Sequence, residues 1–272
     1  MAMRETAIAF IGGGNMAQAI IAGLLEAKFK PENLLVCAPT LETRTSLVKK
    51  YQLNVAQNNA SAVHFAEVIF IAVKPNLIEL VCKELNLAMK ENTKQPLIIN
   101  LAAGQTTTQL QQYLQNSQRI ITAMPNLPSA VCQGLTGLVP AKHCNEDDIK
   151  LADDILSSIG KTVWLDDESK MPALVATAGS APAYFFLFLE AMIESGKKLG
   201  LSHQQAQTSA LQSGMGALTM ALTSEMSVTE LKNKVTSPNG TTQQALDSFS
   251  INNLTHIVND AMQAAAQKAA NY

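Results

Sequence analysis

The sequence predicts an α/β protein in which a doubly wound sheet is followed by an all-helical domain. Two observations lead to this fold class. Through residues 1–165, short apolar runs alternate with longer amphipathic stretches, the rhythm of parallel strands joined by crossover helices. Beyond that point the strand signals stop, and stretches rich in Ala, Gln, Leu and Met continue to the end. We therefore expect one domain over residues 1–165 and a second over residues 166–272.

The first half contains the candidate strands. They lie at residues 7–11, 34–37, 68–73, 97–101, 119–123, 135–139 and 162–165. Helical stretches separate most of them, and one is marked at both ends. Asn145 is a typical N-cap, acidic residues fill the first turn, and Gly160 follows the expected end.

The second half begins after a charged linker, residues 166–172, which ends in proline. Residues 201–224 carry no charge except on His203 when it is protonated, and they include small residues such as Gly214 and Gly216. A helix on the surface of a monomer normally has a charged face. We therefore expect these helices to be buried against a second copy of the chain.

Composition excludes several classes of function. The chain has 272 residues, 47% of them hydrophobic and 15% charged, with a net charge of −2. This balance is typical of a globular protein and gives no basic surface for nucleic acid. Four cysteines without CxxC spacing suggest buried thiols in a reducing compartment, and four scattered histidines suggest no metal site. The early glycine loop leaves no room for a signal peptide, and the uncharged run 173–189 is too short and interrupted for a bilayer. We expect a cytoplasmic protein without a membrane segment.

A glycine-rich loop indicates a dinucleotide site. Gly12, Gly13 and Gly14 directly follow the first apolar strand and open a helix that begins with Asn15, Met16 and Ala17. In the GxGxxG/A pattern, Gly12 permits the tight turn and Gly14 lets a pyrophosphate approach the backbone, while Ala17 allows the helix to pack closely on the strand. The alternative is a glycine turn with a purely structural role.

The end of the second strand favours NADP(H) as the cofactor. NAD enzymes usually have Asp or Glu there to bind the ribose 2′-OH. This chain has Cys37, Ala38, Pro39 and Thr40 instead, so nothing repels a 2′-phosphate, and Thr40 and Arg44 could meet it. Arg44 could equally be a solvated helix residue. NAD(H) stays an alternative cofactor.

Three further junctions fall at the carboxyl ends of predicted strands, where open α/β sheets bind ligands. They are residues 72–75 (AVKP), 101–104 (LAAG) and 123–128 (AMPNLP). Small residues there would let a nicotinamide ring lie against the main chain. Each junction alone is more often an ordinary loop, but three at one edge predict a cleft.

A turn late in the chain predicts an anion site. Residues 237–242 (SPNGTT) run directly into a helical stretch. The first turn of a helix has free backbone N–H groups and the positive end of the helix dipole, which favour an anion. An ordinary helix–helix turn is the alternative.

Taken together, the motifs FIGGGNMAQAI, FIAVKP, NLAAG, AMPNLP, GSAPAY and KVTSPNGTTQQAL closely resemble the pyrroline-5-carboxylate reductase family, in order and over nearly the whole chain. The resemblance implies a Rossmann-like domain followed by a helical dimerisation domain. It implies NAD(P)H-dependent reduction of 1-pyrroline-5-carboxylate to L-proline, the last step of proline biosynthesis. It also implies a homodimer, which in this family often assembles further into a decamer.

The resemblance carries site residues onto this chain. The substrate carboxylate is expected at the main chain of Ser237, Asn239, Gly240, Thr241 and Thr242, with the Thr242 hydroxyl on the ring nitrogen. Glu225 matches a position near the active site, although a solvated charge is an equal alternative. The cofactor contacts fall on Ile11, Gly12, Gly13, Gly14, Asn15, Met16, Asn59, Ala72, Val73, Lys74, Pro75, Ala102, Ala103 and Gly104. Asn239 replaces a glycine common in the family, and we expect the turn to survive because Asn tolerates left-handed geometry.

Two other functions remain open from the sequence. A β-hydroxyacid dehydrogenase of similar layout would need a catalytic lysine in the first helix of the second domain, whereas Lys197 and Lys198 are expected on the next stretch, beyond Gly196. A dinucleotide-binding sensor without turnover is the other. Hydride transfer to a protonated imine needs no strong general acid, which agrees with the lack of paired carboxylates or a candidate histidine.

Overall fold

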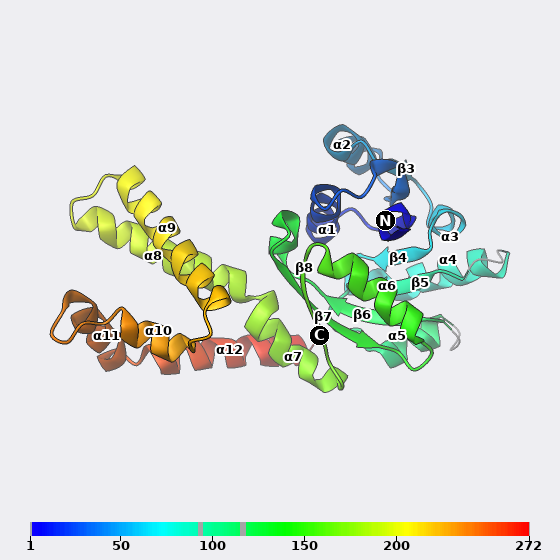
Figure 1. The fold of residues 1–272 in the computed structure, drawn as a ribbon. Coiled ribbons are helices and arrows are strands. Elements are labelled where there is room, and N and C mark those ends of the chain that lie inside the picture. The colour runs from blue at the N-terminus through cyan, green and yellow to red at the C-terminus, as the bar shows by residue number, and fades with distance from the viewer. Residues whose placement is uncertain (1, 92–94, 115–117, 272) are drawn as a thin grey trace. The chain divides into compact units, whose positions relative to one another are not determined.

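The computed structural model describes residues 2–91, 95–114 and 118–271. The chain divides into two compact units, one of Met1–Ser180 with Ala265–Tyr272 and one of Ala181–Ala264. The first unit contains strands and helices and is of the α/β class, whereas the second unit is entirely helical (Figure 1). Both halves of the predicted fold class are confirmed.

The first unit is built on one eight-stranded sheet with the order β3-β2-β1-β4-β5-β6-β7-β8. Strands β1 to β6 run parallel, β7 is antiparallel to β6, and β8 is parallel to β7. The order reverses at β1, which lies between β2 and β4, and such a switch point is where doubly wound sheets bind ligands. The strands are β1 (Ile8–Ile11), β2 (Leu34–Cys37), β3 (Asn54–Ala56), β4 (Val68–Ile71), β5 (Leu97–Asn100), β6 (Ile120–Met124), β7 (Gly134–Pro140) and β8 (Gly160–Trp164).

Helices cover both faces of this sheet. One core contains alternate strand residues, such as Phe10 stacked on Phe70 at 4.9 Å between ring centroids, with side chains from α1, α2 and α6. The other core contains the intervening residues, such as Ile11 and Ile69, with side chains from α3, α4 and α5. Since the central strands are buried on both faces, they read as unbroken apolar runs. The helices are α1 (Asn15–Glu26), α2 (Leu41–Tyr51), α3 (Ala60–Phe65), α4 (Ile78–Lys90), α5 (Thr107–Tyr113) and α6 (Glu146–Ser157).

The predicted elements of the first half are found with small shifts. Each of the seven predicted strands is present, its ends within two residues of those expected. Asn145 caps α6 as predicted, in a reciprocal capping box with Asp148, although the helix ends at Ser157 and Gly160 begins β8. Strand β3 was not predicted, because it has three residues and is only partly buried.

The second unit contains α8 (Ala181–Lys198), α9 (His203–Thr223), α10 (Val228–Lys234), α11 (Thr241–Ile251) and most of α12 (Leu254–Ala270). Helices α8 and α9 pack as a pair (Figure 1). Gly196 lies inside α8, and a Cβ there would be 3.1 Å from the Cβ of Ala206 on α9. The expectation that Gly196 ends this helix is therefore wrong. Lys197 and Lys198 form its last turn, and Lys197 pairs with Glu194 at 2.8 Å.

In the single chain the second unit buries little of its apolar surface. Within it, only Ala206 and Ala210 are buried hydrophobic residues among those that the structure describes. Large side chains such as Phe186, Met215 and Leu222 are exposed on α8 and α9. The helical unit alone does not provide the burial predicted for these helices.

One helical stretch, Glu168–Lys198, is long and apolar enough to cross a membrane by length and composition alone. It joins the short helix α7 (Met171–Leu174) through a π-helical turn (Val175–Gly179) to α8. Pro172 and Pro182 lie in this stretch, and Glu190 and Glu194 are in its second half.

Candidate active site

Gly12 is fixed where three strands meet. Its φ is +100°, a left-handed conformation that favours glycine, and a Cβ there would lie 2.5 Å from the carbonyl oxygen of Ala72 after β4. Its N–H donates to the carbonyl oxygen of Cys37 on β2 at 2.9 Å. The tight turn predicted at Gly12 is present, and no other residue would fit it without strain.

Gly13 and Gly14 face different surroundings. A Cβ at Gly13 would lie 2.9 Å from Cδ1 of Leu47, so α2 packs closely against the loop. A Cβ at Gly14 would have nothing within 4 Å, and Gly14 is the N-cap of α1. Asn15 and Met16 form the first turn, and Ala17 is fully buried. The open space at Gly14, beside the positive end of a twelve-residue helix, fits a pyrophosphate.

The end of β2 carries no carboxylate. Cys37 is buried there, and desolvation raises the pKa of its thiol to about 11, so this thiol is neutral. Thr40 caps α2 through its hydroxyl. Arg44 is not simply solvated on the helix: its Nη1 donates to the carbonyl oxygens of Ala38 at 2.7 Å and Pro39 at 2.8 Å. A cation is thus held at the position where an NAD enzyme has an acid.

A hollow of about 680 Å³ extends from Gly12 past the ends of β2 and β4. The predicted cofactor residues Ile11, Asn59 and Val73 line it, and the apolar side chains of Leu77 and Leu80 form one wall. The amide nitrogen of Asn59 donates to Glu84 Oε2 at 2.6 Å. A hollow lined by both apolar and polar side chains suits part of a dinucleotide.

The junction after β4 is held against β1. Ala72 donates its N–H to the carbonyl oxygen of Ile11 at 2.8 Å. Lys74 then caps a short 3₁₀-helix, Pro75–Leu77. Its extended backbone agrees with the bias that a following proline imposes.

The junction after β5 is held by two side chains that the sequence did not single out. Buried Asn100 clamps Ala102, donating to its carbonyl oxygen at 3.2 Å and accepting its N–H at 3.1 Å. Glu168 accepts the N–H of Thr107 at 3.0 Å and its hydroxyl at 3.2 Å. Gly104 between them has a φ of +74°. The loop Ala102 to Gly104 is therefore fixed at both ends.

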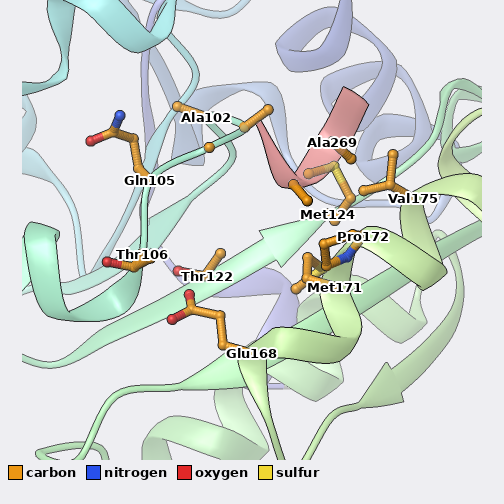
Figure 2. Close-up of a pocket in the computed structure, with 13 residues that line it drawn as sticks. Ala102, Gln105, Thr106, Thr122, Met124, Glu168, Met171, Pro172, Val175 and Ala269 are labelled. Carbon is orange, nitrogen blue, oxygen red and sulfur yellow. The ribbon is translucent and has the colours of Figure 1, made fainter. Parts of the chain in front are cut away.

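This loop borders a second hollow, of about 240 Å³ (Figure 2). Thr122 and Met124 of β6, Glu168, and Met171 from α7 line it with Ala102. Its surface is mostly apolar. A hollow of this kind, at the carboxyl ends of β5 and β6, suits one small ring more than a whole dinucleotide.

The third predicted junction contributes mainly to the fold. Asn126 is buried, accepts the N–H of Leu135 at 2.9 Å and donates to the carbonyl oxygen of Ala178 at 3.1 Å. Residues 127–131 form a 3₁₀-helix beyond it. Of the predicted segment, only Met124 lines the second hollow.

The anion loop lies in the helical unit. Asn239 has a φ of +58°, so the turn keeps the left-handed geometry that was expected of asparagine. Gly240 is the N-cap of α11, and its N–H donates to the carbonyl oxygen of Ser237 at 3.0 Å. The next N–H groups, of Thr241 and Thr242, belong to the first helical turn and have no intrahelical acceptor. Ser237, Asn239, Thr241 and Thr242 are all exposed.

Glu225 lies exposed in the bend between α9 and α10. Within the described ranges, no hydrogen bond joins it to the anion loop. Also within those ranges, no group of three His, Cys, Asp or Glu side chains could hold a metal ion.

The sheet order, the glycine loop and the two hollows define a dinucleotide-binding protein that joins a Rossmann unit to a helical unit. Two family models match the chain. Residues 7–104 match the NADP oxidoreductase, coenzyme F420-dependent, model, and residues 168–272 match the pyrroline-5-carboxylate reductase dimerisation model.

Relatives extend this match over the full length. The pyrroline-5-carboxylate reductase of Pseudomonas aeruginosa is 38% identical over 268 residues, covering 98% of this chain and 97% of the relative. That of Haemophilus influenzae is 37% identical with the same coverage. The structure of the enzyme from Coxiella burnetii has a TM-score of 0.88 at 37% identity and covers 97% of each chain. The structure of the Plasmodium falciparum enzyme, which has NADP bound, has a TM-score of 0.88 at 29% identity, and the match covers 99% of this chain and 98% of that one.

This chain belongs to the pyrroline-5-carboxylate reductase family.

Proposed function

We propose that this protein reduces 1-pyrroline-5-carboxylate to L-proline with NADPH. One observation carries the proposal: a relative of that name is 38% identical over 98% of this chain and 97% of its own length. The Rossmann unit and the turn at 237–242 supply the two kinds of site that such a reaction needs.

NADP(H) is the proposed cofactor, with NAD(H) as a weaker alternative. The Gly12–Gly14 loop fits the pyrophosphate, since Gly14 leaves space that a Cβ would fill. The lack of an acid after β2 and the Arg44 guanidinium at that point both favour a 2′-phosphate. A family member from Plasmodium falciparum was solved with NADP bound.

The residues of this chain would bind and orient the substrate. The first-turn N–H groups of α11 would hold the carboxylate, and the Thr242 hydroxyl would meet the ring nitrogen and relay its proton. Glu225 is proposed to act close to the same centre. Bound NADPH would supply the hydride that reduces the C=N bond at C5. Because a protonated imine is a strong electrophile, positioning can supply much of the acceleration, on the order of 7–11 kcal/mol in favourable cases.

We propose that two chains associate through the helical unit, and that a decamer is a further level of assembly. The exposed apolar faces of α8 and α9 support association, as does the dimerisation model that matches residues 168–272. We also propose that the enzyme is cytoplasmic. Burial of the apolar helix α8 in a protein interface agrees with that location.

The test is an assay with purified protein. NADPH consumption is followed at 340 nm with 1-pyrroline-5-carboxylate, and L-proline is measured as the product. Hydroxy acids with NADP⁺ are tested in parallel. Turnover of the imine alone supports the proposal, turnover of a hydroxy acid points to a β-hydroxyacid dehydrogenase, and NADPH binding without any turnover points to a sensor.

A further inference from the structure

The side chain of Thr122 is a buried hydroxyl without a partner. Thr122 lies on β6 and is 6% exposed. Across the described residues, nothing hydrogen-bonds its Oγ1, which is closed off from water. Buried polar groups in native proteins are nearly always paired, so an unpaired one needs an explanation, such as a ligand that supplies the missing bond.

The position of Thr122 connects it to the loop after β5. Thr122 and Asn100 are partners in the parallel pairing of β5 and β6, so both side chains stand on the same face of the sheet. Asn100 uses both atoms of its amide to clamp Ala102. The unpaired hydroxyl therefore lies next to the residue that fixes Ala102, Ala103 and Gly104.

Thr122 also lines the hollow of about 240 Å³ that this loop borders (Figure 2). Most of the wall is apolar, from residues such as Met124, Met171 and Val175. Two other polar side chains of the wall are engaged, Glu168 with Thr107 and Thr106 with Gln109 in a capping box, and Gln105 also lines the hollow. The Val175 side of the wall is a π-helical turn, a feature often found at functional sites.

We propose that the Thr122 hydroxyl binds the carboxamide of the nicotinamide ring and so positions the ring in this hollow. The inference rests on the proposed function and on the cofactor contacts that the family resemblance leads us to expect at Ala102, Ala103 and Gly104. A carboxamide offers both a donor and an acceptor, and a hydroxyl can satisfy either. Because Oγ1 is closed off from water in this structure, the contact requires a different rotamer about the Cα–Cβ bond of Thr122.

The experiment compares Thr122→Val with Thr122→Ser. Valine keeps the shape and removes the hydroxyl, whereas serine keeps the hydroxyl. Thermal stability is measured without ligand. Affinity is measured by calorimetry for NADP⁺ and for 2′-phospho-ADP-ribose, which lacks the nicotinamide ring. Ser129 provides a matched control, because its Oγ is also buried and unpaired but lies on the 3₁₀-helix beyond Asn126, away from this hollow.

If the hydroxyl contacts nicotinamide, Thr122→Val should not lower the stability of the ligand-free protein but should weaken its binding of NADP⁺. Replacing an unpaired buried hydroxyl by a methyl group should leave the ligand-free Tm of Thr122→Val unchanged or raise it. Its NADP⁺ affinity should fall about two- to tenfold, the range for one hydrogen bond, while its affinity for 2′-phospho-ADP-ribose stays the same. Thr122→Ser should keep most of the NADP⁺ affinity. Ser129→Ala should change neither affinity.

Three results would overturn the inference. The first is unchanged NADP⁺ affinity in Thr122→Val. The second is a lower Tm with equal weakening of both ligands, which would give the hydroxyl a role in the fold. The third is a raised KM for 1-pyrroline-5-carboxylate at unchanged NADP⁺ affinity, which would place the hydroxyl on the substrate. If wild-type protein binds NADP⁺ but does not reduce the imine, the proposed function fails while the affinity comparison still decides the role of Thr122.

Discussion

The two units of this chain differ in how far they bury their apolar side chains. In the Rossmann unit, β1, β2, β4 and β5 are buried along their whole length, and helices complete two separate cores. In the helical unit, long helices are equally regular but their large side chains stay exposed. Regular secondary structure is therefore no sign of a completed core. The first unit has a core of its own, whereas the second does not complete one by itself.

The largest effect should come from a charge placed on the exposed face of the helical unit. Phe186 on α8 is 67% exposed in the single chain. Phe186→Asp should prevent association, because an unpaired carboxylate is costly to bury. Sedimentation should show a 29.1 kDa monomer with little activity, where wild type is larger. Val48→Asp, on exposed Val48 of the Rossmann unit, should leave assembly intact. A wild-type protein that is a stable, active monomer would break the comparison.

Two neighbouring glycines of the Rossmann unit should respond very differently. Gly12→Ala puts a Cβ 2.5 Å from a carbonyl oxygen at a left-handed φ, so it should destabilise the unit and lower kcat/KM at least about a hundredfold. Gly14→Ala meets nothing within 4 Å, so the ligand-free Tm should not change. Its NADPH affinity should fall about tenfold or more, because the methyl group occupies the space for the pyrophosphate. Calorimetry and thermal unfolding of both variants check this, and unchanged affinity in Gly14→Ala would contradict it.

Thr242→Val tests the proposed chemistry of the helical unit. The change removes a hydroxyl at an exposed first-turn position, so folding and NADPH binding should be intact. Loss of a hydrogen bond to a charged group, about 1.5–3 kcal/mol, should lower kcat and kcat/KM together by roughly ten- to a hundredfold. Steady-state kinetics with saturating NADPH provide the measurement. Full kcat/KM in this variant would show that the proton comes from elsewhere.

The smallest effect should be a change of cofactor preference. Arg44→Leu should lower kcat/KM with NADPH about tenfold and alter that with NADH less than twofold, because only NADPH has the 2′-phosphate. Lys49→Leu, also on α2 but in its last turn, is the control. Equal losses with both cofactors would mean that Arg44 only holds the turn at Ala38 and Pro39.

Much of the Rossmann unit could be predicted, because its signals are local. An apolar run such as 68–71 and a cap such as Asn145 need no knowledge of the rest of the chain. The direction of β7 could not be predicted, since nothing in the 3₁₀ connection before it indicates whether the chain turns back. β3 was missed because it is short and lies at the edge of the sheet.

The candidate site was predictable where glycine and strand ends mark it, and not where distant side chains complete it. Gly12 and Asn239 have the backbone geometry that their sequence positions suggested. Glu168 holds the N–H of a residue 61 positions away, so no sequence pattern could have revealed that contact. Thr122 stands inside an apolar run, where a single hydroxyl gives little signal. Asn100, a polar residue that ends an apolar strand, was a signal that could have been used.

The exposed apolar faces of α8 and α9 would make the behaviour of this protein depend on its concentration. If those faces are buried only when chains meet, association contributes to the stability of every chain, and by mass action that contribution falls on dilution. The specific activity would then fall as the protein concentration falls, instead of staying constant. Newly synthesised chains would gain their full stability only after finding one another.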